Sequence, residues 1–222
     1  MLNLLSSATK IILSNSMQNK QYLFHNLKDG DLIGFHFKSW KYIAGVFIGK
    51  VTGKTGNDLK VPGLGHIGIV TNVKRSQNIV FFSFCEYVVA GGKTVNNYSI
   101  IKDKSAEYLL DTHFQRKDVD FYYTEIKTSL NSKELAIVNK FWQDKESYSL
   151  VEAMLSPNWA ERILKFVGIK KKTKSNNFCS GGVYDCLKLA GRKFDLEKEN
   201  GAPTPVELIN NNIFDKTTKI CL

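Results

Sequence analysis

Two alternating runs of residues, joined by a short polar segment, constrain the fold more than any other feature of the chain. They are GHIGIVTNV at 65–73 and NIVFFSFCEYVV at 78–89. Alternation with a period of two is typical of a strand that turns one face toward a core. The connecting residues KRSQ are few enough to predict an antiparallel hairpin. We therefore expect an antiparallel sheet built around this pair.

Other segments extend this sheet or supply helices. Segments 31–37, 95–103 and 118–127 also have strand-like composition. Asn131 or Ser132, followed by Glu134, is a helix-start signal, and Gly191 is a helix-end signal. The helices expected from such signals and from apolar periodicity are 1–24, 131–147, 149–169 with a break at Pro157, 179–191 and a short one within 203–214.

The order of these elements predicts an α+β domain with helices at both ends and antiparallel strands between them. Residues 1–24 are expected to form a helical extension, and residues 25–222 a single domain. No apolar run is long enough to span a bilayer, and the N-terminal segment lacks the basic start and apolar centre of a signal peptide. We expect a protein that stays in the cytoplasm, is released by lysis or is carried in a virion.

The formal net charge of +10 favours anionic surroundings such as a cell wall or a membrane surface. Apart from KKKTK at 170–174 the lysines are scattered, and no zinc-finger, RNA-binding or phosphate-loop motif accompanies them. Nucleic acid is therefore not the expected partner. The cysteines lack the spacing of a disulfide framework and the histidines that of a metal site, so no metal or other cofactor is expected.

The two hairpin strands each carry a residue that suits proton transfer. Strand periodicity places His66 and Gly68 on one face, and a glycine beside the imidazole is expected to leave open space for an approaching group. Glu86 lies in an otherwise apolar strand, where a carboxylate needs a partner. If the strands pair, Glu86 can accept a hydrogen bond from His66 and stabilise the imidazolium. The alternatives are a structural histidine and an exposed glutamate.

Cys179 stands where a polar segment becomes a helix. The free N–H groups and the dipole of a helix N-terminus favour a thiolate there, and the backbone N–H groups of Cys179 and Ser180 can bind an oxyanion. Cys186 lies almost two turns further on the same helix, too far for a shared metal or an undistorted disulfide. We interpret Cys186 and Cys85 as core residues, and Cys221 as a thiol of the C-terminal tail.

Five short segments in this order resemble the circularly permuted NlpC/P60-type papain-like hydrolases, the YiiX/YaeF-like group. They are GDLI at 30–33, GHIGIV at 65–70, CE at 85–86, FCSGGVYDCLKLAG at 178–191 and PTPVELINNNIF at 203–214. In that group the histidine strand comes first, then an acidic or polar orienting residue, and then a cysteine at a helix start.

The resemblance implies a permuted papain-like fold, in which a sheet or barrel packs against helices that include the cysteine helix. It also implies thiol hydrolase chemistry, in which Cys179 attacks a carbonyl, His66 shuttles the proton and Glu86 orients His66. An amide bond, for example in cell-wall peptides, is the expected target. An acyltransferase or lipid hydrolase of the same fold is one alternative, and a catalytically silent phage or virion protein is another.

Two features depart from the family pattern. Gly181 and Gly182 follow the Cys-Ser pair, where the family usually has bulkier residues. The segment 38–64 between the first two motifs is long, which suggests a loop that faces the substrate. The residues expected to contact a substrate are Trp40, Tyr42 and Gly68.

Overall fold

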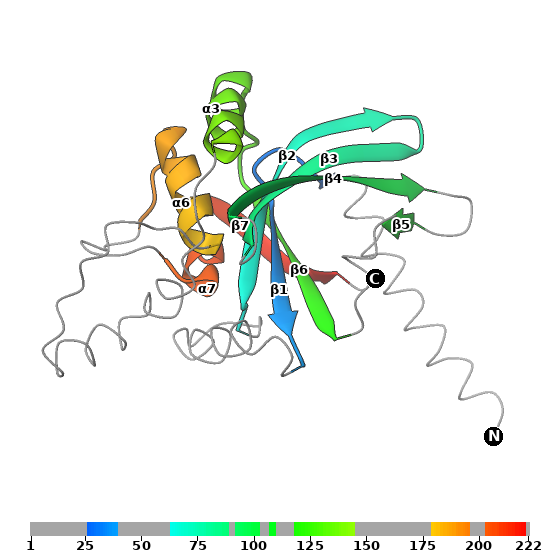
Figure 1. Ribbon diagram of the computed structural model, residues 1–222, viewed down its shortest axis with the longest axis horizontal. Helices are drawn as coiled ribbons and strands as arrows, with labels where there is room; N and C mark the ends of the chain where they lie inside the picture. The colour runs from blue at the N-terminus through cyan, green and yellow to red at the C-terminus, as the bar shows by residue number, and fades with distance from the viewer. Residues whose placement is uncertain are drawn as a thin grey trace, which may run out of the picture.

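Seven strands form one antiparallel sheet in the order β5-β4-β3-β2-β1-β6-β7 (Figure 1). The computed structural model describes residues 26–39, 63–88, 92–102, 107–109, 118–144, 179–195 and 203–220. The strands are β1 Leu32–Phe37, β2 His66–Ser76, β3 Ile79–Val88, β4 Gly92–Lys102, β5 Glu107–Leu109, β6 Val119–Ile126 and β7 Phe214–Ile220. The first strand therefore lies in the middle of the sheet, paired with β2 on one side and β6 on the other.

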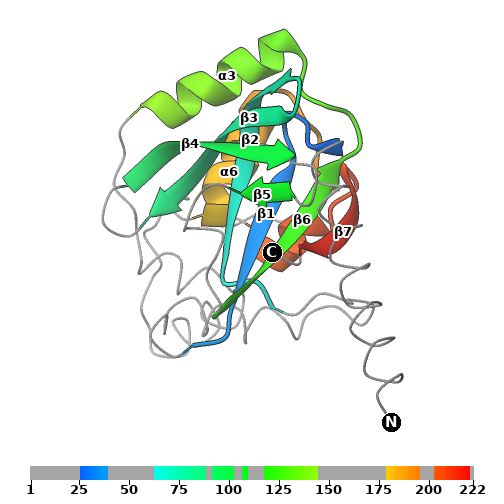
Figure 2. The ribbon, with the colours of Figure 1, turned by 90° about the vertical axis from the view of Figure 1, so that its right-hand side faces the viewer.

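Three helices lie on one side of this sheet (Figure 1 and Figure 2). They are α3 Ser132–Gln143, α6 Cys179–Leu189 and α7 Pro205–Ile209. Helix α6 packs on β2 and β3, while α3 packs on β4 and on α6. Both α3 and α7 begin with a capping box, in which Asn131 pairs with Glu134 and Thr204 with Glu207. The N-terminal N–H groups of these helices are thus satisfied by their own side chains.

Strand alternation separates two apolar clusters, one on each face of the sheet. The helix-covered face carries Leu32, Ile67, Ile69, Cys85 and Tyr87. The opposite face carries residues such as Ile33, Phe35, Val70, Phe82 and Phe84. Because neighbouring residues of one strand belong to different clusters, a register slip by one residue would exchange the two faces.

The predicted α+β class, the antiparallel sheet and the central hairpin are confirmed. The turn is tighter than KRSQ suggests, because β2 continues to Ser76 and only residues 77–78 form the turn. The expectation that the domain ends in a helix is wrong, since α7 is followed by β7, which pairs with β6. Residues 1–24 and 149–169 lie outside the described residues. No helix in the described ranges combines the length and apolar character needed to cross a membrane.

Asp31, which precedes β1, connects the start of that strand to β6 through hydrogen bonds. Its carboxylate accepts hydrogen bonds from the Tyr123 hydroxyl at 2.6 Å, the Ile126 amide at 2.9 Å and the Lys28 amide at 2.7 Å. The residue is fully buried, so water cannot replace these partners. The preceding turn requires Gly30, whose φ of 100° lies in the left-handed region.

Replacing Asp31 with alanine is expected to lower the free energy of unfolding by about 3 kcal/mol, because three buried donors lose their acceptor. Urea unfolding followed by circular dichroism measures this loss. Tyr123→Phe, which removes one donor and keeps the ring, is expected to cost only about 1 kcal/mol. Equal losses for the two variants would show that the backbone donors contribute nothing.

Candidate active site

The His66 ring and the Glu86 carboxylate form a short hydrogen bond between neighbouring strands. His66 begins β2 and Glu86 lies near the end of β3, and the register Ile69↔Cys85 brings both to the same end of the hairpin. The distance from His66 Nε2 to Glu86 Oε2 is 2.6 Å. The carboxylate side chain is 2% exposed and the imidazole 15% exposed. The pairing that Glu86 needs in an apolar strand is therefore present.

Cys179 completes a group of three. It is the first residue of α6, it is 2% exposed, and it acts on the His66 ring strongly enough to raise the pKa of that ring. Since Nε2 of the ring faces Glu86, Nδ1 is the nitrogen left for the sulfur. The structure thus brings Cys179, His66 and Glu86 together in the order thiol, imidazole and carboxylate.

The electrostatics of this group favour a charged imidazole. Burial by itself lowers the pKa of His66, but the hydrogen bonds to Cys179 and Glu86, together with their charges, raise it to about 10. The ring is therefore an imidazolium at neutral pH. Since this value lies above the ordinary 6.5, protonation of His66 stabilises the fold fully below about pH 6.5, and this contribution is lost as the pH rises through about 10.

Two further residues contact the group, and no local sequence pattern points to them. Phe35, opposite His66 on β1, contacts the imidazole edge-on with a centroid distance of 5.0 Å. Asn96 on β4 donates a hydrogen bond to Glu86 Oε1 at 3.3 Å. The sequence does show that Asn96 and Thr94, two residues apart, share one face of a strand. Only the register between β3 and β4 shows that this face meets Glu86.

The Gly181-Gly182 step is explained by close packing at Gly182. A Cβ atom at Gly182 would lie 2.4 Å from the Tyr87 ring and 3.1 Å from the Trp142 ring. Glycine therefore lets the first turn of α6 approach strand β3, which carries Tyr87 next to Glu86. Ser180 is also fully buried, and its hydroxyl has no hydrogen-bond partner within the described part of the chain.

The open space expected beside His66 is not there. A Cβ atom at Gly68 would lie 2.3 Å from the Phe84 ring and 2.8 Å from the Cys85 carbonyl oxygen. The glycine makes room for Phe84, and its assignment as a substrate contact stays a prediction. The space is filled because Phe84 shares the His66 face and its ring is large enough to cover the glycine. Trp40 and Tyr42 lie outside the described residues.

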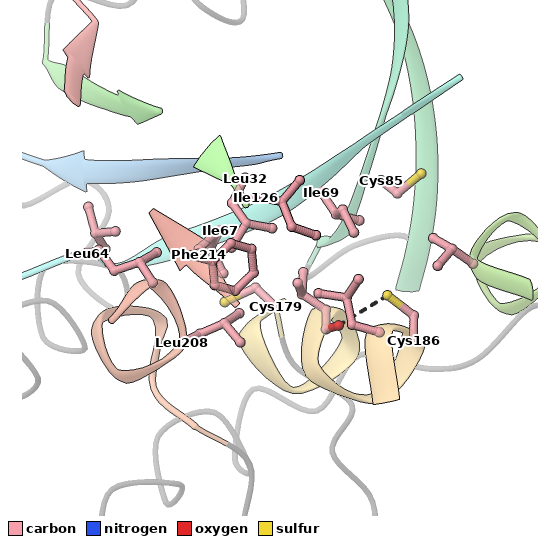
Figure 3. Close-up of a cluster of buried hydrophobic side chains, with 14 of the residues drawn as sticks. Leu32, Leu64, Ile67, Ile69, Cys85, Ile126, Cys179, Cys186, Leu208 and Phe214 are labelled. Carbon is pink, nitrogen blue, oxygen red and sulfur yellow. Dashed lines mark hydrogen bonds between the residues drawn. The ribbon is translucent and has the colours of Figure 1, made fainter. Parts of the chain in front are cut away.

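Cys85 and Cys186 are core residues, as expected, and both are fully buried. Figure 3 shows Cys186 further along α6 than Cys179, with its thiol donating to the Val183 carbonyl oxygen at 3.2 Å. Burial raises the pKa of Cys85 to about 11 and raises that of Cys186 as well. Both thiols therefore stay protonated at neutral pH.

Within the described ranges, no three side chains of histidine, cysteine, aspartate or glutamate gather in a group able to hold a metal ion. His36 instead bonds the Gly63 carbonyl oxygen through Nδ1 at 2.8 Å. Comparison of the chain with protein-family models, with curated proteins and with solved structures finds no match. The geometry of Cys179, His66 and Glu86 is therefore the main evidence on function.

Proposed function

We propose that this protein is a thiol hydrolase of the circularly permuted NlpC/P60-type papain-like group, and that it cleaves an amide bond. The observation that carries the proposal is the placement of His66 between the Glu86 carboxylate and the Cys179 thiol, with Cys179 at a helix N-terminus. Imidazoles buried between a thiol and a carboxylate are suited to nucleophilic catalysis. The two other buried cysteines have different partners: Cys85 lies 3.5 Å from Thr71 Oγ1, and Cys186 donates to the Val183 carbonyl oxygen.

The reaction would proceed in two halves. The Cys179 sulfur attacks the carbonyl carbon, the C–N bond breaks, and the imidazolium of His66 gives its proton to the leaving amine. Water then attacks the thioester carbonyl carbon while His66 accepts a proton from it, the C–S bond breaks, and the acid is released as the sulfur leaves as a thiolate beside the imidazolium. Glu86 stays hydrogen bonded to Nε2 of the ring throughout, and thereby fixes the orientation of the ring and stabilises its charge.

The oxyanion of each tetrahedral intermediate would bind at the N-terminus of α6. The first N–H groups of a helix have no partner within the helix, and at α6 these belong to Cys179 and Ser180. Such donors stabilise the developing negative charge without having to reorient. Gly182 supports this arrangement, because it lets the same turn pack closely against Tyr87.

Peptides of an anionic cell wall are the proposed substrate class, since the chain carries a formal net charge of +10. The test is to incubate the purified protein with peptidoglycan and, separately, with phospholipid vesicles, and to identify the products by mass spectrometry. New amino groups from peptidoglycan are expected, and none from a protein in which Cys179 is alanine. Release of fatty acid without cleavage of any amide would refute the amidase proposal and indicate acyl chemistry instead.

A further inference from the structure

The side chain of Asn96 contacts the oxygen of Glu86 that does not face His66. Register places Thr94 of β4 directly opposite Glu86 of β3, and Asn96 opposite Phe84. The Asn96 amide nitrogen lies 3.3 Å from Glu86 Oε1, while Glu86 Oε2 lies 2.6 Å from His66 Nε2. The two carboxylate oxygens thus have separate partners on separate strands.

The orientation of the Asn96 amide is determined by its neighbours. Its nitrogen also donates to Thr94 Oγ1 at 3.2 Å. An ionised carboxylate only accepts hydrogen bonds, so the NH2 group and not the amide oxygen must face Glu86. Thr94, with a hydroxyl that can accept the second N–H, keeps the amide from turning over.

We propose that Asn96 is a positioning residue, which holds Glu86 so that its other oxygen stays directed at the His66 ring. This inference rests on the proposed function in one respect, namely that His66 transfers a proton during the reaction. A neutral amide suits the task because it satisfies a buried carboxylate oxygen without neutralising its charge. A lysine in place of Asn96 would compete with the His66 imidazolium for the negative charge of Glu86.

Substitution of Asn96 changes no charge around His66. The ionisable groups that act on the His66 ring are Cys179 from α6 and Glu86 from β3. Cys85, the neighbour of Glu86 in β3, is uncharged at neutral pH because burial raises its pKa to about 11. Any shift in the titration of His66 in an Asn96 variant therefore reports how Glu86 is placed.

The experiment compares Asn96→Leu, which keeps the volume without a donor, and Asn96→Ala with the wild-type chain. The matched control is Asn97→Ala, because Asn97 is the adjacent residue on the other face of β4 and bonds Ser83 at 2.9 Å. The readouts are the titration of the His66 ring by NMR and the rate at which iodoacetamide alkylates Cys179 at neutral pH. Neither readout requires a substrate.

Both Asn96 variants are expected to titrate His66 at lower pH and to alkylate Cys179 about tenfold more slowly, as is usual for a lost supporting hydrogen bond. Thr94→Val is expected to shift both readouts in the same direction but less, and it keeps the test intact if an Asn96 variant does not fold. Folded Asn96 variants with unchanged titration and alkylation would overturn the proposal, as would equal effects in Asn97→Ala. If the wild type cleaves no amide while the titration still shifts, the positioning role stands and the hydrolase proposal fails.

Discussion

Replacing Cys179 with alanine is expected to abolish alkylation by iodoacetamide at neutral pH and to lower kcat/KM for amide hydrolysis by at least about 10⁴-fold. The sulfur is the nucleophile that attacks the amide in the proposed reaction, and an alanine side chain cannot form the thioester. The same variant is expected to titrate His66 at lower pH, because the hydrogen bond and the charge from Cys179 both raise the pKa of His66. Mass spectrometry of the alkylated protein, product release and NMR measure these three effects.

Cys186→Ala is the matched control, because it also removes a buried thiol from α6. The Cys186 thiol donates to the Val183 carbonyl oxygen within its own helix, further along α6 than Cys179 (Figure 3). Its loss is expected to leave the alkylation of Cys179 and the titration of His66 unchanged. Alkylation that persists in Cys179→Ala and disappears in Cys186→Ala would sink the assignment of the nucleophile.

The second large effect is expected from Glu86→Gln. Removal of the negative charge lets the pKa of His66 fall from about 10 toward its ordinary 6.5, since burial lowers it and only Cys179 then opposes this. Because the protonated ring must supply the proton for the leaving amine, the alkaline limit of activity moves to lower pH. At neutral pH we expect kcat/KM to fall about 10²-fold. Profiles of kcat/KM and of iodoacetamide alkylation against pH measure both effects.

Glu125→Gln is the control for this change. Glu125 lies on β6, remote from the hairpin end that carries Glu86. Its carboxylate forms an ion pair with Lys28 at 2.8 Å. The same chemical change there is expected to leave the pH profile unaltered. An unchanged profile in Glu86→Gln would mean that Glu86 does not govern the charge of His66, despite the 2.6 Å contact.

Local composition was enough to predict the centre of the sheet. The segment around His66 and the segment around Glu86 are rich in β-branched and aromatic residues, and both form strands as that composition predicts. The helix that begins at Cys179 and ends before Gly191 was predicted for the same kind of reason, because its start and end signals lie within the segment itself. The juxtaposition of Cys179 with His66 was expected from the order of motifs, not from any local pattern.

Features that depend on distant partners were not predicted. Strand β7 was missed because Phe214–Ile220 contains polar residues and gains its strand pairing from β6. The open space expected beside Gly68 is absent because the ring that fills it comes from Phe84 on the next strand. Gly182 could not be explained for the same reason, since Tyr87 lies far from it in the sequence. In each case a side chain from elsewhere in the chain decides what the residue does.

The arrangement of the site also has a consequence for the order of events during synthesis. His66 and Glu86 belong to one hairpin, so they can meet soon after that hairpin leaves the ribosome. Cys179 follows about half a chain length later, and contacts between such distant segments form late because loop closure must be overcome first. The pairing of His66 with Glu86 is therefore expected to precede the docking of α6, which brings Cys179 to them.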